Sequence, residues 1–341
     1  MSSRGSGDAE LDELASIVQK GPGSIPDDGA FAIRSFAGPQ RYAEMMDPIR
    51  VAHLTDQHFG RVTPMQIQKR ALELTKAGKP DLVVITGDFV CHSQLYIDAM
   101  IEALSSIEVP TFAVLGNHDH WSGADEVRRG LRKAGVELLD NAHTTITIRH
   151  QKLQVLGLDD AYTGHADPEK ALRGLRHDVP TLALSHIAEE ADLLWARGIP
   201  LVLAGHTHAG QITLARMHEM LIGRVAGHRY VHGLYGDRRA PAPMGSVYVG
   251  AGIGAAVMPV RLGERAKREV AFFELGVPPD AAKNEHHVSQ PPMPGRKPSE
   301  AVQRKRALAV LKKQLKRERR NGVDRRSAPR EGGSRGRRHD D

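Results

Sequence analysis

The chain has 341 residues, 40% of them hydrophobic but only 4% aromatic, which is typical of a globular protein with an aliphatic core. Its single cysteine, Cys91, excludes an intrachain disulfide and agrees with a reducing compartment. The net charge of +6 is uneven, because residues 276–341 carry 18 Lys or Arg against 8 Asp or Glu, which leaves −4 for residues 1–275. The positive net charge is therefore a property of residues 276–341 and says little about what residues 1–275 bind.

Residues 1–45 are rich in Gly, Ser, Pro and Asp without a sustained period, and we expect a poorly ordered N-terminal segment there. This segment lacks the basic region and apolar core of a secretory signal. The longest apolar stretch, residues 246–260, is too short and too rich in glycine to cross a bilayer. We therefore expect a cytoplasmic protein with no integral membrane segment, and peripheral contact with the inner face of the membrane stays open.

Residues 46–275 read as one α/β domain, because short β-rich apolar runs alternate with segments of helical spacing. The expected strands lie at residues 49–55, 81–86, 111–115, 153–158, 181–185, 200–204, 246–250 and 269–275. The expected helices lie at residues 64–78, 95–104, 124–135 and 188–198. The last two strands have no helix between them, which favours a mixed, double sheet.

Residues 276–341 open with a Pro-rich linker and continue as a basic tail, which we expect to be largely disordered apart from a short helix at 299–320. Leu308, Leu311 and Leu315 share one face of this helix amid basic residues. That pattern is compatible with an anionic membrane surface, with nucleic acid, or with a tail that is simply solvated. The sequence leaves the three alternatives open.

Metal-ligating side chains follow five of the expected strands. They are Asp56, His58, Asp88, Asn117, His186, His206 and His208. Because ligands in open α/β sheets bind beyond the carboxyl ends of strands, we expect these side chains at one sheet edge, where Gly87, Gly116 and Gly205 permit close backbone approach. The set contains oxygen and imidazole donors without a thiolate, which suits Mn, Fe, Co, Ni or Zn. Seven donors exceed what one ion needs and suit a pair of ions.

The motifs "DQH", "GD", "GNHD", "LSH" and "GHTH", in this order, resemble the signature of the calcineurin-like metallophosphoesterase superfamily over roughly residues 48–275. The resemblance implies an α/β fold with two sheets between helical layers (αββα) and hydrolysis of a phosphate ester or pyrophosphate by a metal-bridging hydroxide. It implies that Asp56, His58 and His208 bind one divalent ion, that Asn117, His186 and His206 bind the other, and that Asp88 bridges both. It also implies that His118 assists the leaving group and that Asp119 orients His118.

Two positions depart from the family pattern. Gln57 stands where an apolar residue is common, and Cys91 stands where many members have a further Asp after "GD". Neither is a usual ligand, so the expected metal site survives. We expect His53 to be a structural histidine of the core, whereas His120 and Trp121 follow "GNHD" closely enough to border a substrate pocket.

The stretches "GNHDHWSGADEV" and "GHTHAGQI" also resemble a bacterial subgroup that includes UDP-2,3-diacylglucosamine pyrophosphatases of lipid A synthesis. A nucleotide-linked or lipid-linked diphosphate, hydrolysed with manganese or a similar ion, is therefore the favoured substrate. Apolar residues at 214–222 would provide a mouth for acyl chains or would simply pack in the core. A nuclease or cyclic-nucleotide phosphodiesterase, and a non-catalytic scaffold with a binding tail, are the alternatives.

Overall fold

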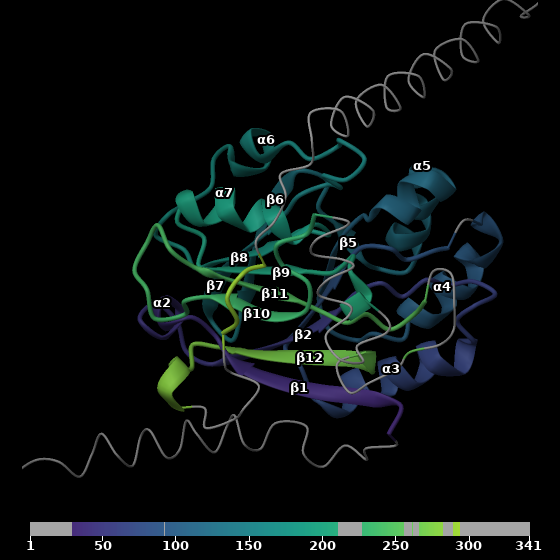
Figure 1. Cartoon of the computed structure of the whole chain (residues 1–341), viewed down its shortest axis with the longest axis horizontal. Helices are drawn as coiled ribbons and strands as arrows, with labels where there is room; N and C mark the ends of the chain where they lie inside the picture. Colours follow the sequence, from purple (N-terminus) through teal and green to yellow (C-terminus); the bar gives the residue numbers. More distant parts are fainter. Residues whose placement is uncertain are drawn as a thin grey trace, which may run out of the picture. The chain divides into compact units, whose positions relative to one another are not determined.

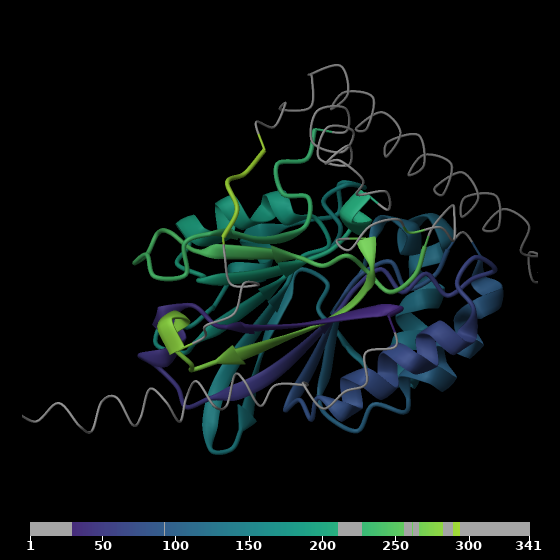
Figure 2. The same ribbon diagram turned by 60° about the horizontal axis from the view of Figure 1, so that its bottom comes forward.

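The computed structural model describes residues 29–91, 93–210, 227–255, 261, 266–281 and 289–293. In these residues two six-stranded sheets pack against each other, and helices cover the outer face of each (Figure 1, Figure 2). The expected double sheet between two helical layers is confirmed. Within the part described, no helix combines the length and the apolar content needed to cross a membrane.

The first sheet is mixed, with β12 antiparallel to β2 and the other neighbours parallel. Its strands, in spatial order, are β1 (Phe31–Ala37), β12 (Arg268–Leu275), β2 (Ile49–Leu54), β3 (Leu82–Thr86), β4 (Thr111–Val114) and β5 (Glu137–Leu138). The second sheet has antiparallel outer pairs around a parallel centre. Its strands are β10 (Gly233–Gly236), β11 (Ser246–Val249), β9 (Leu201–Ala204), β8 (Thr181–Leu184), β7 (Gln151–Gly157) and β6 (Ala142–Ile148).

Helices line both outer faces. They are α3 (Met65–Ala77), α4 (Ile97–Leu104) and α5 (Asn117–Lys133) on the first sheet, and α6 (Pro168–Leu172) and α7 (Ala191–Ala196) on the second. The described residues also contain single helical turns: α2 (Gln40–Ala43), η1 (Gln94–Tyr96), η2 (Ala188–Glu190), η3 (His208–Gly210) and η7 (Pro279–Ala281). The central strands are buried on both faces, which is why they read as continuous apolar runs. On β3, Val83 and Ile85 pack toward the helices, whereas Leu82 and Val84 pack between the sheets.

Four strands that the sequence did not predict belong to these sheets: β1, β5, β6 and β10. β1 lies inside residues 1–45, where Arg34 and Ser35 interrupt the apolar pattern, and β6 is a largely polar strand that pairs with β7. All four are edge strands, so the pattern of a two-sided core is missing from them. The domain limits at residues 45 and 275 stay predictions, and the expected helix at 299–320 lies outside the described residues.

A buried carboxylate on β12 connects the two sheets. Glu269 accepts hydrogen bonds from Arg34 Nε of β1 at 2.5 Å and from the hydroxyl of Tyr248 on β11 at 2.5 Å, and His232 Nε2 lies 3.0 Å away. Burial by itself raises the pKa of Glu269, but the charges of Arg34 and His232 hold it well below its ordinary value. The carboxylate therefore stays ionised and ties β12 both to β1 of the same sheet and to β11 of the other sheet.

We predict that Glu269→Ala lowers the free energy of unfolding by roughly 3 kcal/mol, because it removes the buried carboxylate that pairs with Arg34, a side chain only 15% exposed. Glu108→Ala is the matched control, since Lys76 and Glu108 pair with side chains 70% and 76% exposed and such pairs contribute about 1 kcal/mol or less. Urea denaturation measures both. The stabilisation by Glu269 is present above the ordinary carboxyl pKa and is lost as the pH falls through its lowered folded-state pKa. The difference in unfolding free energy between the wild-type protein and Glu269→Ala should therefore become smaller in acid. Equal losses in the two variants would contradict this role.

Candidate metal centre

The candidate ligands lie where strands of both sheets end. Asp56 and His58 follow β2, Asp88 follows β3, Asn117 begins α5 after β4, His186 follows β8, and His206 and His208 follow β9. Since β2, β3 and β4 belong to one sheet and β8 and β9 to the other, the expectation of a single sheet edge is wrong. The site is built instead across the carboxyl-terminal edges of two packed sheets.

The first group of side chains surrounds one point. His58 Nε2 lies 2.9 Å from His208 Nε2, and His208 Nε2 lies 3.3 Å from Asp56 Oδ1. His58 Nε2 is also 3.6 Å from Asp88 Oδ2. One ligand atom from each of these four residues lies within 4.8 Å of the others, a spacing at which a cation would draw them together.

The second group meets the first at Asp88. His186 Nε2 lies 3.2 Å from Asn117 Oδ1, 3.3 Å from His206 Nδ1 and 3.4 Å from Asp88 Oδ2. The same carboxylate oxygen therefore faces a histidine of each group. The seven residues that the sequence singled out are brought together as two sets that share Asp88.

Five of these seven residues have a left-handed backbone. The φ angles are 49° at Asp56, 47° at His58, 55° at Asp88, 76° at His206 and 50° at His208. Non-glycine residues adopt such angles rarely and at a cost of order 1 kcal/mol or more each. Tight left-handed turns directly after the strands thus direct the side chains into the space between the sheet edges.

Two glycines allow the backbone to approach the carboxylates closely. A Cβ on Gly116 would lie 2.2 Å from Asp88 Oδ1, and one on Gly205 would lie 2.4 Å from Asp56 Oδ2. No side chain fits at either distance, so glycine is required for steric reasons. The two glycines therefore leave the space that the Asp56 and Asp88 carboxylates occupy.

Hydrogen bonds around the groups orient the ligands further. His186 Nδ1 lies 2.7 Å from the carbonyl oxygen of Thr86, so a proton on Nδ1 is held there and Nε2 faces Asp88. Thr55 Oγ1 donates to Asp56 Oδ2 at 2.8 Å, and the backbone N–H of His206 donates to the same oxygen at 3.0 Å. Such contacts fix the histidine tautomer and the carboxylate orientation at metal sites.

The electrostatics favour neutral imidazoles at three positions. Burial lowers the pKa of His58 to about 3 and that of His208 to about 3, with the guanidinium of Arg261 as the next cause at His208. Burial and then His186 hold the pKa of His206 well below its ordinary value. Neutral imidazole is the form that binds a metal ion, so these donors and the carboxylates fit a divalent cation.

Asp88 and His186 form a buried ion pair when no cation is bound. Burial raises the pKa of Asp88, but the neighbouring His186 lowers it well below its ordinary value overall. Burial lowers the pKa of His186, but the charge of Asp88 raises it well above its ordinary value overall. A proton on His186 therefore occupies the place that a cation on Nε2 would take.

Asp119 makes contacts that differ from the expected one with His118. Its carboxylate accepts hydrogen bonds from the backbone N–H groups of Phe89 at 2.8 Å, Val90 at 3.1 Å and Gly116 at 2.9 Å. Asp119 lies in the first turn of α5, where backbone N–H groups lack helical partners. It holds the turn after β3 against the start of α5 and so supports the Asp88 turn, and the expected role of orienting His118 stays a prediction.

His118 lies at the opening of the site. Its backbone N–H donates to Asp88 Oδ1 at 2.8 Å, and its Nε2 is 4.0 Å from Asp88 Oδ2. Trp121, which is 47% exposed, packs edge-on against His118 with ring centroids 4.9 Å apart. Trp121 thus borders the site. The His120 ring instead packs against other residues, with Nε2 2.7 Å from Asp159 Oδ1 and the ring stacked on that of His165.

Sequence reasoning missed two residues beside the ligands. Tyr162 lies in the loop after β7, with its ring centroid 5.2 Å from that of His206 and 6.1 Å from that of Trp121. Arg261 has Nη2 3.3 Å from His208 Nδ1 and donates from Nη1 to the carbonyl of Ala251 at 2.8 Å. The polar run "DDAYTGH" directly after a buried strand was the available signal for Tyr162. His53, as expected, is a buried structural histidine, 2.8 Å from Thr86 Oγ1.

Known proteins resemble this chain in the same region. The sequence profile described as calcineurin-like phosphoesterase matches residues 49–210. "Phosphodiesterase YaeI" of Escherichia coli (strain K12) is 30% identical over 236 residues, covering 67% of this chain and 82% of that protein. "Uncharacterized metallophosphoesterase YkuE" of Bacillus subtilis (strain 168) is 29% identical over 235 residues, covering 67% and 79%. The crystal structure of TT1561 of Thermus thermophilus aligns with a TM-score of 0.42 and 15% identity, over 60% of this chain and 90% of that one.

The chain therefore belongs to the calcineurin-like phosphoesterase family and is a metal-dependent phosphohydrolase. The described residues contain a candidate metal-binding cluster that suits this class. The resemblance to the superfamily is confirmed, whereas neither relative is named for UDP-2,3-diacylglucosamine.

We predict that Gly116→Ala removes most of the bound metal, because the added methyl group would displace the Asp88 carboxylate. Gly135→Ala is the matched control. Gly135 has a positive φ, of 78°, whereas φ is −109° at Gly116, and a Cβ on Gly135 would meet nothing within 4 Å, so this control carries backbone strain without a steric clash. The control should lose stability while keeping its metal, and elemental analysis of the purified variants measures the metal content. Full metal content in Gly116→Ala would contradict the steric argument.

We also predict that metal binding releases protons, because a cation on His186 Nε2 must displace the proton that Asp88 retains there. Since the pKa of His186 is raised, the metal-free protein carries this proton at neutral pH, and metal affinity should fall as the pH falls. Calorimetric titration with Mn²⁺ in buffers of different ionisation enthalpy measures the release. A binding enthalpy that is the same in all buffers would argue against the ion pair.

Proposed function

We propose that this chain hydrolyses phosphate esters, with phosphodiesters preferred, at a site that holds two divalent ions with Asp88 between them. Asp56, His58 and His208 would hold one ion, and Asn117, His186 and His206 the other. The observation that carries the proposal is the position of Asp88 Oδ2, 3.6 Å from a histidine of the first group and 3.4 Å from one of the second. Two such ions, when bound, lower the pKa of water and neutralise phosphate charge.

His118 is the proposed general acid for the leaving group. Its side chain is 13% exposed, so it meets solvent at the opening of the site while its Nε2 faces Asp88. A proton held on Nε2 would pass to the leaving oxygen of the ester, a step that contributes on the order of 10²–10⁴-fold to rate. The N–H to Asp88 Oδ1 bond sets the distance between this ring and the ligands.

Trp121 and Tyr162 support a substrate with a flat organic group. Both rings lie beside candidate site residues, Trp121 against His118 and Tyr162 against His206. Aromatic side chains at such a mouth bind bases by stacking. This favours a nucleotide-linked ester, and it agrees with the phosphodiesterase name of the relative that is 30% identical.

Three substrates of this chemistry are proposed for comparison. UDP-2,3-diacylglucosamine offers a uracil to the aromatic pair, although the apolar segment 214–222 expected for its acyl chains lies outside the described residues. Cyclic nucleotides and nucleic acid offer the same kind of base, so a nuclease or a cyclic-nucleotide phosphodiesterase remains a candidate. A protein loaded with Mn²⁺ and assayed on these three, and on simple mono- and diesters, ranks them by kcat/KM.

We predict that Asp88→Asn loses both bound metal and activity, because the neutral amide cannot balance two cations. His118→Ala should retain its metal and lose rate by on the order of 10²-fold or more. Metal analysis together with hydrolysis of a simple diester separates the two. An Asp88→Asn protein that keeps full activity, or a metal-loaded His118→Ala protein with full turnover, would refute the proposed roles.

We predict that Trp121→Ala raises KM roughly tenfold for a nucleotide-containing ester, because one stacking contact is worth about 1–3 kcal/mol. The kcat value and the hydrolysis of an alkyl phosphate should change little. Leu193→Ala, at another exposed apolar residue, is the matched control. A similar KM change on both kinds of substrate would show that Trp121 supports the fold of the site and not its specificity.

A further inference from the structure

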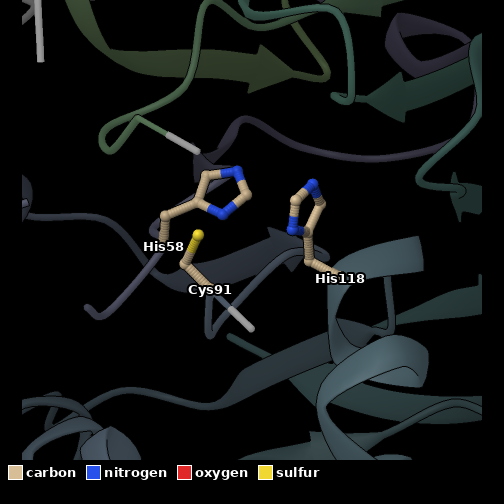
Figure 3. A group of neighbouring side chains, drawn as sticks. All are labelled: His58, Cys91 and His118. Atoms are coloured by element: carbon tan, nitrogen blue, oxygen red, sulfur yellow. The ribbon is translucent and has the colours of Figure 1, made fainter. Parts of the chain in front are cut away.

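A thiol lies beside the candidate metal centre, next to His58 and His118. Cys91 is the only cysteine of the chain and follows Asp88 in the turn after β3. Its Sγ, one ring nitrogen of His58 and one ring nitrogen of His118 all lie within 4.8 Å of one another. Figure 3 shows the thiol and the two imidazoles directed into one space, each from a different segment of the chain.

His58 provides an independent indication that something binds in this space. Its Nε2 faces His208, Asp56 and Asp88, so one side of the ring serves the first ligand group. Its Nδ1 is fully buried and has no hydrogen-bond partner among the described residues. A buried polar atom left without a partner costs about 1–3 kcal/mol, so such atoms in native sites call for an explanation.

We propose that His58, Cys91 and His118 form a third cation site, selective for thiophilic ions such as Zn²⁺ and Cd²⁺. One sulfur and two imidazole nitrogens are a soft-to-borderline donor set, unlike the two sets that share Asp88, each of which has two oxygen donors and two imidazoles, and solvent would complete a tetrahedron. Metal–ligand bonds of roughly 2.0–2.3 Å place ligand atoms about 3.3–3.8 Å apart. The three ligand atoms must therefore move slightly closer together to bind one ion. The side chains of Cys91 and His118, which are partly exposed, can move more easily than that of the buried His58.

Occupation of this site would have a chemical consequence. The thiol proton and the Nδ1 proton of His58 would pass to solvent, and Cys91 would bind as a thiolate. The ring of His118 would then be held by the cation and would no longer serve a leaving group. The inference rests on the proposed function only in this consequence; the site itself depends on the geometry of three side chains.

A cadmium titration tests the site directly. Because Cys91 is the only thiol, any thiolate-to-cadmium charge-transfer band in the ultraviolet reports on this residue alone. The wild-type protein titrated with Cd²⁺ should develop the band, and Cys91→Ser should lack it and bind one Cd²⁺ fewer per chain. A wild-type protein that binds Cd²⁺ without the band, or unchanged stoichiometry in Cys91→Ser, would overturn the proposal.

Two further variants separate this site from the centre around Asp88. Asp88→Asn should keep the charge-transfer band, because none of the three proposed ligands is changed. His118→Ala removes one ligand, so a higher Cd²⁺ concentration should be needed to produce the band. Loss of the band in Asp88→Asn would mean that the thiol joins an ion of the Asp88 centre, which contradicts a separate site. Absence of Mn²⁺-dependent hydrolysis in a protein that shows the band would overturn the proposed function alone.

Discussion

The site depends on one carboxylate whose position is set by its surroundings. Asp88 has a left-handed backbone with φ of 55°, its Oδ1 accepts the N–H of His118, and Gly116, which has no Cβ, leaves the space that this oxygen needs. Its Oδ2 is therefore the oxygen that faces His58 and His186, one histidine from each group. Three N–H bonds to Asp119 hold the neighbouring turn, so the position of Asp88 is fixed by the start of α5 as well as by the end of β3.

This arrangement concentrates charge that the protein alone balances poorly. Asp56, Asp88 and Asp119 are all buried, and burial followed by the charge of Asp88 raises the pKa of Asp119 to about 7, although the N–H groups of Gly116 and Val90 lower it. Burial raises the pKa of Asp56 as well. Uncompensated buried carboxylates are costly, and the proton on His186 compensates only in part. Divalent cations would supply the missing positive charge, so metal affinity and folding stability should be linked.

Much of this could be predicted from the sequence, because the central strands are buried on both faces and end in motifs whose residue types suit metal ions. The fold class and the grouping of seven residues followed from these motifs. Their division between two sheets did not, since a strand such as β8 reads the same in either sheet. The left-handed turns at Asp56 and His206, the contacts of Asp119 and the place of Tyr162 were also missed, because each depends on partners distant in the sequence. The edge strands β1, β5, β6 and β10 were not predicted, because strands at the edge of a sheet lack the continuous apolar run of a central strand.

The central claim is that two cations share Asp88. Anomalous X-ray diffraction from crystals of the Mn²⁺-loaded protein tests it most directly, because the peaks locate the metal without reference to activity. We expect two peaks about 3.5–4 Å apart, the spacing in two-metal hydrolases, with Asp88 between them, Asp56, His58 and His208 around one, and Asn117, His186 and His206 around the other. A single peak, or peaks that Asp88 does not touch, would contradict the account.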